Sequence, residues 1–288
     1  MLCTIGDLIE DVVVWQGEAT HHASDTSSRI ERTRGGSAAN VAYFAAASGL
    51  SARFIGQVGA DRLGDQLIES MREAGVDVIA RRGGRTGSVV VLVQPDGERT
   101  MFPDRGCSPD LTEVNGSVLD GVTALHVPMY SLTGGLLTDT ATRLIAEAHE
   151  RNILVSIDAS SVSVLEDFGI SACLALISRL RPRVLLCNDD EARTLGIDAL
   201  PQGVPTVIVK RGSRPIIVFD STGRREIHIA PVDHVVDTTG AGDAFAAGFL
   251  SALAATGDVD RAVQAGHAIA IRALSSPGAT LEPMGNQE

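Results

Sequence analysis

The stretch DTTGAGDAF, from Asp237 to Phe245, combines small residues with two carboxylates and leads into the apolar run AAGFLSALAA. If a helix begins near Gly240, its first backbone N–H groups have no partner within the helix and point out of its positive end. Small residues let an anion reach these N–H groups, so the stretch can bind a phosphate without a basic side chain. Asp243 would lie in the first turn, either as a base for an attacking hydroxyl or as an acid that complements the helix dipole.

Polar residues also follow two other apolar runs. In CNDDEA, Asn188 and Glu191 stand three residues apart after RVLLC, so a helix that begins here carries both toward one crevice. Such a pair can orient water around Mg²⁺, and it also fits a capping box at a helix start. In VKRGSRP, Lys210 and Gly212 follow PTVIV, where a cation and a free backbone can meet a nucleotide phosphate or form an ordinary turn.

The N-terminal part of the chain holds a second polar set. Asp11 follows a strand-like run and a turn, and RGGSAAN places Gly35 and Gly36 ahead of Asn40 in a helix of small residues. A buried Asp and Asn need hydrogen-bond partners, and the hydroxyls of a polyol would supply them. The alternative is that Asn40 bonds to local backbone and Asp11 is a turn residue.

The elements that must position these residues alternate between strand and helix. VTALHVP, NILVSIDAS, RVLLCN and PTVIVKRG are strand-like, and helical stretches separate the first three of them. Repeated βα units predict an α/β fold whose parallel sheet has helices on both faces and binds ligands beyond the carboxyl ends of its strands. We expect a single domain over residues 1–288.

Residues 77–103 depart from this alternation. Short β runs lie between Gly-rich turns there, and PDGE is a β-turn sequence. Together with residues 11–33 they predict a small separate sheet that acts as a lid. The apolar run SVVVLV could lie buried within one subunit or, as the family resemblance described below implies, form a homodimer contact through this lid.

Composition narrows the range of partners. A chain of 288 residues with 44% hydrophobic and 3% aromatic residues suits a core of Ala, Val, Leu and Ile around a parallel sheet. A formal net charge of −12 argues against nucleic-acid and membrane partners, which require a broad positive face. Cysteines without a CxxC pair, and no signal-like or membrane-length apolar segment, indicate a cytoplasmic protein with reduced thiols. The P-loop, GxGxxG, GxSxG and HExxH motifs are absent.

Taken in order, the markers resemble the ribokinase-like, or PfkB, family of carbohydrate and nucleoside kinases. Its two signatures correspond to GGSAANVAYFAAASGLSARFIGQVGADRLGDQLIESMREAGV and DTTGAGDAFAAGFLSAL, and the resemblance covers nearly the whole chain. It implies a three-layer α/β/α fold with a central, mainly parallel sheet and a small β lid. It also implies phosphorylation of a hydroxyl on a small sugar or sugar derivative, with ATP and Mg²⁺ as cofactors.

The resemblance assigns roles to individual residues. Asp243 would be the catalytic base, and Gly240, Ala241 and Gly242 would form the anion hole. The residues implied on the nucleotide side are Asn188, Glu191, Lys210, Gly212 and His267, of which Glu191 would act on Mg²⁺ through water and His267 would lie near the adenine. The residues implied on the acceptor side are Asp11, Gly35, Gly36 and Asn40.

Other positions bear on the cofactor and the acceptor. Asp237 and Thr239 match the start of a loop that binds K⁺ in several relatives, which makes K⁺ a candidate cofactor. Ser37 stands where ribokinases proper commonly carry Lys, and Val127–Met129 stands where they carry an acidic residue, so D-ribose is not the expected acceptor. Arg105 either reaches the acceptor site, which would suit a carboxylated or phosphorylated sugar, or is a solvated lid residue.

Two alternatives to a sugar kinase stay open. The first is a nucleoside kinase of the same family, to which the triplet GGS followed by Asn40 is similar. The second is a non-catalytic relative that senses a sugar or a nucleotide. The intact GAGD run with Asp243 favours an enzyme over this second alternative.

Overall fold

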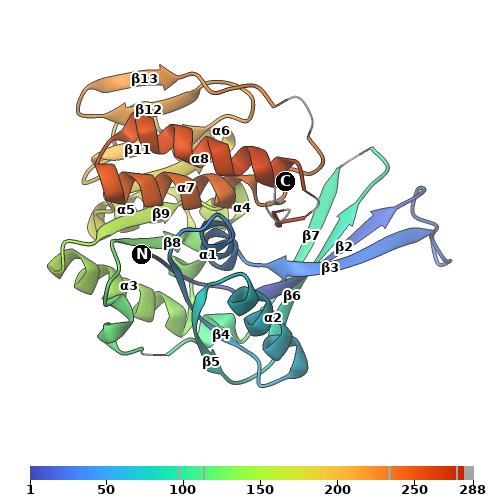
Figure 1. The fold of residues 1–288 in the computed structure, drawn as a ribbon. Coiled ribbons are helices and arrows are strands. Elements are labelled where there is room, and N and C mark those ends of the chain that lie inside the picture. The colour runs from blue at the N-terminus through green and yellow to red at the C-terminus, as the bar shows by residue number, and fades with distance from the viewer. Residues whose placement is uncertain (97, 113, 233–234, 277, 282–288) are drawn as a thin grey trace, which may run out of the picture.

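The computed structural model describes residues 1–96, 98–112, 114–232, 235–276 and 278–281. Within these residues the strands form two sheets (Figure 1). The large sheet lies between helices, and the small sheet projects away from it at one side.

The large sheet is mainly parallel. Among the described residues it has nine strands, in the order β13 (Gly223–Ile227), β12 (Ile216–Asp220), β11 (Thr206–Lys210), β10 (Val184–Asn188), β9 (Leu154–Asp158), β8 (Ala124–Pro128), β1 (Leu2–Ile5), β4 (Ala52–Val58) and β5 (Asp77–Arg82). Strands β11 to β5 pair in parallel, whereas β12 and β13 are antiparallel. The carboxyl ends of β8, β9, β10 and β11 therefore lie at one edge of the sheet.

Helices cover both faces of this sheet. One layer contains α1 (Ser37–Ala47), α2 (Arg62–Glu73), α7 (Ala241–Thr256) and α8 (Val259–Leu274). The other contains α3 (Gly135–Glu150), α4 (Val162–Phe168), α5 (Ile170–Leu180) and α6 (Asp189–Thr194), together with the short 3₁₀ turns Ser108–Asp110, Gly116–Leu119 and Met129–Leu132. Strand β10 supplies Val184 and Leu186 to the first core and Leu185 and Cys187 to the second, as the alternation of a strand buried on both faces requires. The predicted three-layer α/β/α architecture is confirmed.

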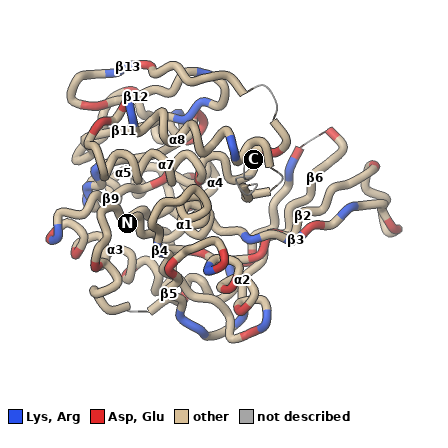
Figure 2. Tube along the Cα trace, viewed as in Figure 1, with Lys and Arg blue, Asp and Glu red and all other residues tan. Residues whose placement is uncertain are grey.

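Helices α1 and α7 pack against each other through small residues. Ala38, Ala42 and Ala45 of α1 and Ala244 and Ala247 of α7 are all buried in the same core. Side chains this small let the two backbones approach closely. Figure 2 shows α1 as a segment without charge, and its sequence contains no Asp, Glu, Lys, Arg or His. Asp243 is therefore the one carboxylate brought to the α1–α7 contact by these two helices.

The small sheet has the order β3 (Ser28–Gly35), β2 (Ile9–Gln16), β6 (Thr86–Val93) and β7 (Arg99–Gly106). Strands β2 and β6 are parallel, and the two outer strands pair antiparallel to them. The predicted lid range 77–103 is wrong at its start, because Asp77–Arg82 forms β5 and pairs with β4 at the edge of the large sheet. Its side chains complete the packing of α2, so these residues belong to the main body.

The cysteines lie apart in the core. Cys3, Cys107, Cys173 and Cys187 are all buried as free thiols. Among the described residues, we find no helix that combines the length and the apolarity needed to cross a bilayer.

Candidate active site

Asp243 lies in the first turn of α7 and is held from α1. Ser37 Oγ donates a hydrogen bond to Asp243 Oδ1 at 2.7 Å, and Asn40 Nδ2 donates one to Oδ2 at 3.0 Å. Burial raises the pKa of Asp243 to about 6, even though these two hydrogen bonds favour the carboxylate. The carboxyl group is thus oriented by two donors and has a proton affinity close to that needed of a general base near neutral pH.

The loop before α7 has the backbone that an anion site needs. Gly240 is the N-cap of α7 with φ 74°, in the left-handed region, and no side chain caps the helix there. A Cβ at Gly240 would lie 2.9 Å from Ala279 Cβ and 3.0 Å from Phe44 Cε2, so only glycine fits. No side chain caps the N–H groups of the first turn, as the sequence indicated, although that of Ala241 donates to Thr238 O at 3.3 Å.

Lys210 brings a positive charge to this helix terminus. A Cβ placed on Gly242 would lie 3.3 Å from Lys210 Nζ, so the ammonium group lies beside the first turn of α7. The sequence predicted that backbone N–H groups could bind an anion here and, separately, that Lys210 could meet a nucleotide phosphate; the fold brings the two together. Both are positive, so they favour an anion at the same place.

Lys210 is itself held by a buried carboxylate. Its Nζ lies 2.8 Å from Asp158 Oδ2 at the end of β9, and both side chains are largely buried. Burial alone would raise the pKa of Asp158, but the Lys210 ammonium outweighs it and holds this pKa below its usual value. Burial would likewise lower the pKa of Lys210, and Asp158 and Glu191 reverse that effect. The pair therefore stays charged.

Asn188 and Glu191 form a complete capping box at the start of α6. Asn188 Oδ1 accepts from Glu191 N at 2.9 Å, while Glu191 Oε2 accepts from Asn188 N at 2.7 Å and Oε1 from Asn188 Nδ2 at 2.8 Å. Asn188 is exposed at the end of β10, whereas Glu191 is buried. Burial, with the nearby Asp158 charge, raises the pKa of Glu191 to about 7. The structural interpretation of this pair is confirmed, and a cation nearby would relieve the repulsion between the two carboxylates.

On the acceptor side, Asp11 lies against the glycine pair. A Cβ on Gly35 would come within 2.1 Å of Asp11 Oδ1, so this glycine leaves room for the carboxylate of β2. Burial raises the pKa of Asp11 to about 6; the Arg34 charge opposes this rise and the Asp243 charge adds to it. Gly36 follows as the N-cap of α1. Asp11, Asn40 and Asp243 are therefore neighbours, although the sequence separates them widely.

Arg34 is a buried cation at the centre of this group. Its Nη2 donates to Asn40 Oδ1 at 3.0 Å and to Ala279 O at 2.6 Å, and its guanidinium carbon lies 3.8 Å from the centre of the Tyr43 ring. Because Asn40 Oδ1 accepts from Arg34, its Nδ2 must point to Asp243. Arg34 thereby orients the amide that holds the proposed base.

Arg105 does not stand free in a solvated lid. Its Nε donates to Asp7 Oδ2 and its Nη2 to Asp7 Oδ1, both at 2.7 Å, and Asp7 is buried next to Gly36. A bidentate pair of this kind fixes both side chains. Arg105 is thus close to the N-terminus of α1, with its charge matched by Asp7.

Asp237 and Thr239 contact each other and a cationic side chain. Thr239 N and Oγ1 donate to Asp237 Oδ1 at 2.9 and 2.7 Å, and Arg99 of β7 donates to both residues. Hydrogen bonds from Thr239, Gly278 and Arg99 outweigh the effect of burial and hold the pKa of Asp237 below its ordinary value. The carboxylate at the start of the anion-hole loop is therefore fully engaged by donors.

The family profile described as pfkB family carbohydrate kinase matches residues 1–284. The chain belongs to this family. A relative, the ATP-dependent ribose-1-phosphate kinase of Halopiger xanaduensis, is 32% identical over 272 residues, which cover 92% of this chain and 88% of that protein. The predicted family and the predicted class of enzyme, a phosphotransferase with an alcohol group as acceptor, are confirmed.

Solved structures share the pfkB fold with this chain. The adenosine kinase of Sinorhizobium meliloti superposes with a TM-score of 0.85 at 22% identity, over 98% of this chain and 96% of that one. An E. coli protein in complex with ATP and Mg²⁺ superposes with a TM-score of 0.81 at 21% identity, over 96% of this chain and 94% of that one. At these identities the likeness extends to the fold alone.

Two residues expected on the nucleotide side of this pfkB kinase stand apart from the cluster. His267 is buried in α8, and its Nε2 lies 2.8 Å from Ala230 O. Gly212 lies in the turn after β11 with φ 61° and has open space around the position of a Cβ. Neither has a contact with Asp243, Lys210 or Glu191 among the described interactions, so their roles toward a nucleotide stay predictions.

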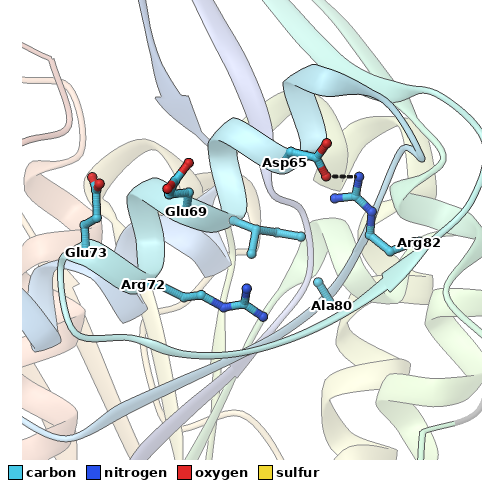
Figure 3. A pocket seen from close by; sticks show the side chains of 7 residues that line it. Asp65, Glu69, Arg72, Glu73, Ala80 and Arg82 are labelled. Carbon is cyan, nitrogen blue, oxygen red and sulfur yellow. Dashed lines mark hydrogen bonds and ion pairs between the residues drawn. The ribbon is translucent and has the colours of Figure 1, made fainter.

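A surface groove of this kinase lies elsewhere. It has a volume of about 790 Å³ and runs between α2 and β5 (Figure 3). Arg82 pairs with Asp65 across it at 2.5 Å, and Arg72, Glu69 and Glu73 also line it. None of the sequence-predicted site residues lines it, and its charges alternate in sign. We do not assign the catalytic chemistry to this groove.

Sequence reasoning missed several residues that hold the site together. Asp158 carried a usable signal, since it is an acid at the end of the strand-like run NILVSID. Arg34 directly precedes the glycine pair, but an exposed arginine is compatible with the same local sequence. The sequence therefore gave no reason to expect that Arg34 is buried. Asp7 and Arg99 gave no signal, because their partners lie 98 and 138 residues away.

Proposed function

We propose that this chain is an ATP-dependent kinase that transfers the γ-phosphoryl group to a hydroxyl of a small sugar or sugar derivative. The observation that carries the proposal is the pair of hydrogen bonds from Ser37 and Asn40 to Asp243, at the uncapped N-terminus of α7. They place a carboxylate beside a positive helix end, where an acceptor hydroxyl and a phosphate would have to meet.

In this mechanism Asp243 accepts the proton of the attacking hydroxyl. The acceptor hydroxyl takes over one of the contacts now made by Ser37 and Asn40, so the carboxylate exchanges one donor for another. Backbone N–H groups of Gly240, Ala241 and Gly242, with Lys210, stabilise the charge that develops on the transferred group. Alignment and charge stabilisation supply most of the rate, and a base contributes about 10²- to 10⁴-fold.

Mg²⁺ fits the carboxylates at the ends of β9 and β10. Burial and mutual repulsion raise the pKa of Glu191, and the ligand chemistry of carboxylates and water suits Mg²⁺. Asn188 and Glu191 would hold the ion through water, while Asp158 keeps Lys210 in place. When bound, Mg²⁺ neutralises and orients the phosphates of ATP.

Asp11 and Asn40, with space provided by Gly35 and Gly36, would bind hydroxyls of the acceptor. The H. xanaduensis relative is named as a kinase of ribose-1-phosphate, so a phosphorylated pentose belongs among the acceptors to be tested. Arg105 lies on this side of the site, where Asp7 holds its guanidinium in place, and its positive charge would favour an anionic acceptor nearby. A nucleoside is the alternative acceptor class.

The small sheet would act as a lid over the acceptor and limit hydrolysis of ATP by water. Its outer face carries Val90 and Phe102 side by side across β6 and β7, with exposures of 37% and 54%. Exposed apolar side chains of this kind support a homodimer through the lid, whereas Val91 and Val93 of SVVVLV are buried within the chain. A monomer in light scattering at micromolar concentration would exclude this dimer.

The proposed activity is tested by a coupled ADP-release assay with Mg-ATP. The acceptors are pentoses, hexoses, phosphorylated sugars, keto-sugar acids and nucleosides, and the proteins are wild type and Asp243→Asn. We expect acceptor-dependent turnover that falls about 10²- to 10⁴-fold in the variant, with ATP binding and the melting temperature retained. If wild type binds ATP but turns over none of the acceptors, either the panel lacks the substrate or the chain is a sensing relative.

A further inference from the structure

The loop that precedes the anion hole is tied to the small sheet by one side chain. Arg99 Nη2 donates to Asp237 Oδ1 at 2.9 Å, and Arg99 Nη1 donates to Thr239 Oγ1 at 3.0 Å. Arg99 is the first residue of β7, 138 residues away in the chain from Asp237. A single guanidinium therefore bridges the small sheet and the loop that leads into α7.

Both oxygens of the Asp237 carboxylate already have donors. Oδ1 accepts from Thr239 N, Thr239 Oγ1 and Arg99, and Oδ2 accepts from Gly278 N at 3.0 Å. The Asp237 side chain is only 6% exposed, and that of Arg99 is 29% exposed. The ion pair is thus largely shielded from water, which strengthens it relative to a surface pair.

Strand register directs Arg99 toward the site. Arg99 pairs with Val93, Val93 pairs with Trp15, and Trp15 lies on the same face of β2 as Asp11 because side chains alternate along a strand. Arg99 and Asp11 consequently project from the same face of the small sheet, opposite to the face that carries Phe102. This is the face turned to Asp243.

The Arg99 contact is incompatible with a K⁺ site at Asp237 and Thr239. A K⁺ ion bound as in those relatives would need the Asp237 carboxylate as a ligand beside carbonyl oxygens, but both carboxylate oxygens already accept hydrogen bonds, Oδ1 from Arg99 and Thr239 and Oδ2 from Gly278. The Arg99 guanidinium would also repel a K⁺ ion bound to the same Asp237 carboxylate, because both are positively charged. The two side chains that suggested K⁺ therefore do not fit that ion while Arg99 is in place.

We infer that Arg99 is a built-in cation for the anion-hole loop and makes phosphoryl transfer independent of a monovalent metal ion. It is a positioning residue. By holding Asp237 and Thr239 it fixes the turn that ends at Gly240, where the N–H groups of α7 begin. This inference rests on the proposed kinase activity, but its structural part concerns the loop and the cation alone.

The test compares K⁺ with choline at equal ionic strength in wild type, Arg99→Ala and Arg99→Lys. Wild type should turn over its acceptor equally well in both salts. Arg99→Ala should lose about 10- to 100-fold in choline, as expected for a lost hydrogen-bonded charge, and should regain activity with K⁺ or free guanidinium ion. Arg99→Lys keeps the charge and should retain most of the activity without K⁺.

Arg29→Ala is the matched control. Arg29 is another arginine of the small sheet, but it pairs with Glu31 on an exposed surface and stacks on Trp15. Its removal should change neither the rate nor the response to salt. A uniform loss in both arginine variants would mean that the small sheet simply tolerates no change, and would overturn the specific role of Arg99.

A second measurement does not depend on turnover. Thermal unfolding of wild type should give the same melting temperature in K⁺ and in choline, whereas Arg99→Ala should melt lower in choline and be stabilised by K⁺. Activation or stabilisation of wild type by K⁺ overturns the inference, as does an Arg99→Ala protein that is unimpaired or that no cation rescues. If the protein phosphorylates no acceptor, the proposed function fails and the melting curves still decide the role of Arg99.

Discussion

On the acceptor side of the candidate site, the side chains that meet come from β2, β3, α1 and α7, and the bonds to Asp243 join residues 203 and 206 positions apart. On the nucleotide side, Asn188 and Glu191 bond across three positions and cap a helix of the protein itself. The acceptor-side group satisfies its hydrogen bonds through tertiary contacts, whereas the pair of Asn188 and Glu191 satisfies them through local structure. The difference separates residues whose present contacts point to catalysis from residues whose present contacts already have a structural purpose.

Lys210→Met gives the largest expected effect and tests whether the nucleotide side holds a charge needed by the fold. The change leaves Asp158 buried without its partner, which should lower the free energy of unfolding by about 3–5 kcal/mol. Urea unfolding measures it. Arg85→Met, which breaks the exposed pair with Asp104, should cost less than about 1 kcal/mol. Equal losses in the two variants would mean that the Asp158 pair is no more buried in solution than a surface pair.

Asp11→Asn tests whether the acceptor side acts on the acceptor alone. Loss of a charged hydrogen-bond acceptor should raise the KM for the sugar about 10- to 100-fold and leave the KM for ATP unchanged. Steady-state kinetics with either substrate varied separates the two constants. Glu10→Gln, at the adjacent position of β2 and paired with Arg32, is the control. A shift of both KM values would show that Asp11 also affects ATP binding, which would contradict the division of the site into an acceptor side and a nucleotide side.

The pH dependence of kcat/KM sharpens the assignment of the base. Burial raises the pKa of Asp243 to about 6, and only the deprotonated form can accept a proton. Activity should therefore be full above this pKa and fall about tenfold per unit of pH below it. Since burial also raises the pKa of Asp11 to about 6, the profile must be repeated with Asp11→Asn. A plateau that extends down to pH 4 in both proteins would contradict the buried base.

Glu191→Gln gives the smallest expected effect and asks whether the cap is also a Mg²⁺ residue. Glutamine can keep the bond from Asn188 N but loses the one from Asn188 Nδ2, while it also removes a buried charge next to Asp158, so the melting temperature should change little. Loss of the negative charge should weaken the apparent affinity for Mg²⁺ by up to about tenfold. Titration of Mg²⁺ at fixed ATP measures this. An unchanged Mg²⁺ requirement would mean that Glu191 serves the helix cap alone. The difference in role between this pair and the acceptor-side residues would then be larger.

Much of the site could be predicted because its signals are local. The small residues before α7, the box formed by Asn188 and Glu191, and the alternation of strands with helices each involve neighbours in the chain. Which strands pair with each other is harder to predict from the sequence. Residues 77–82 have the composition of a β run, and only their pairing with β4 assigns them to the large sheet.

By itself, the sequence determined the family, the α/β architecture and the positions of the proposed base and the proposed anion hole, because small residues and helix starts act through adjacent backbone groups. Only the tertiary structure decided that Lys210 lies beside Gly242, that Arg34 orients Asn40, and that Arg99 holds Asp237 and Thr239. A long basic side chain can reach many partners from one position. Which carboxylate or carbonyl it meets depends on how distant elements pack, and no short stretch of sequence records that.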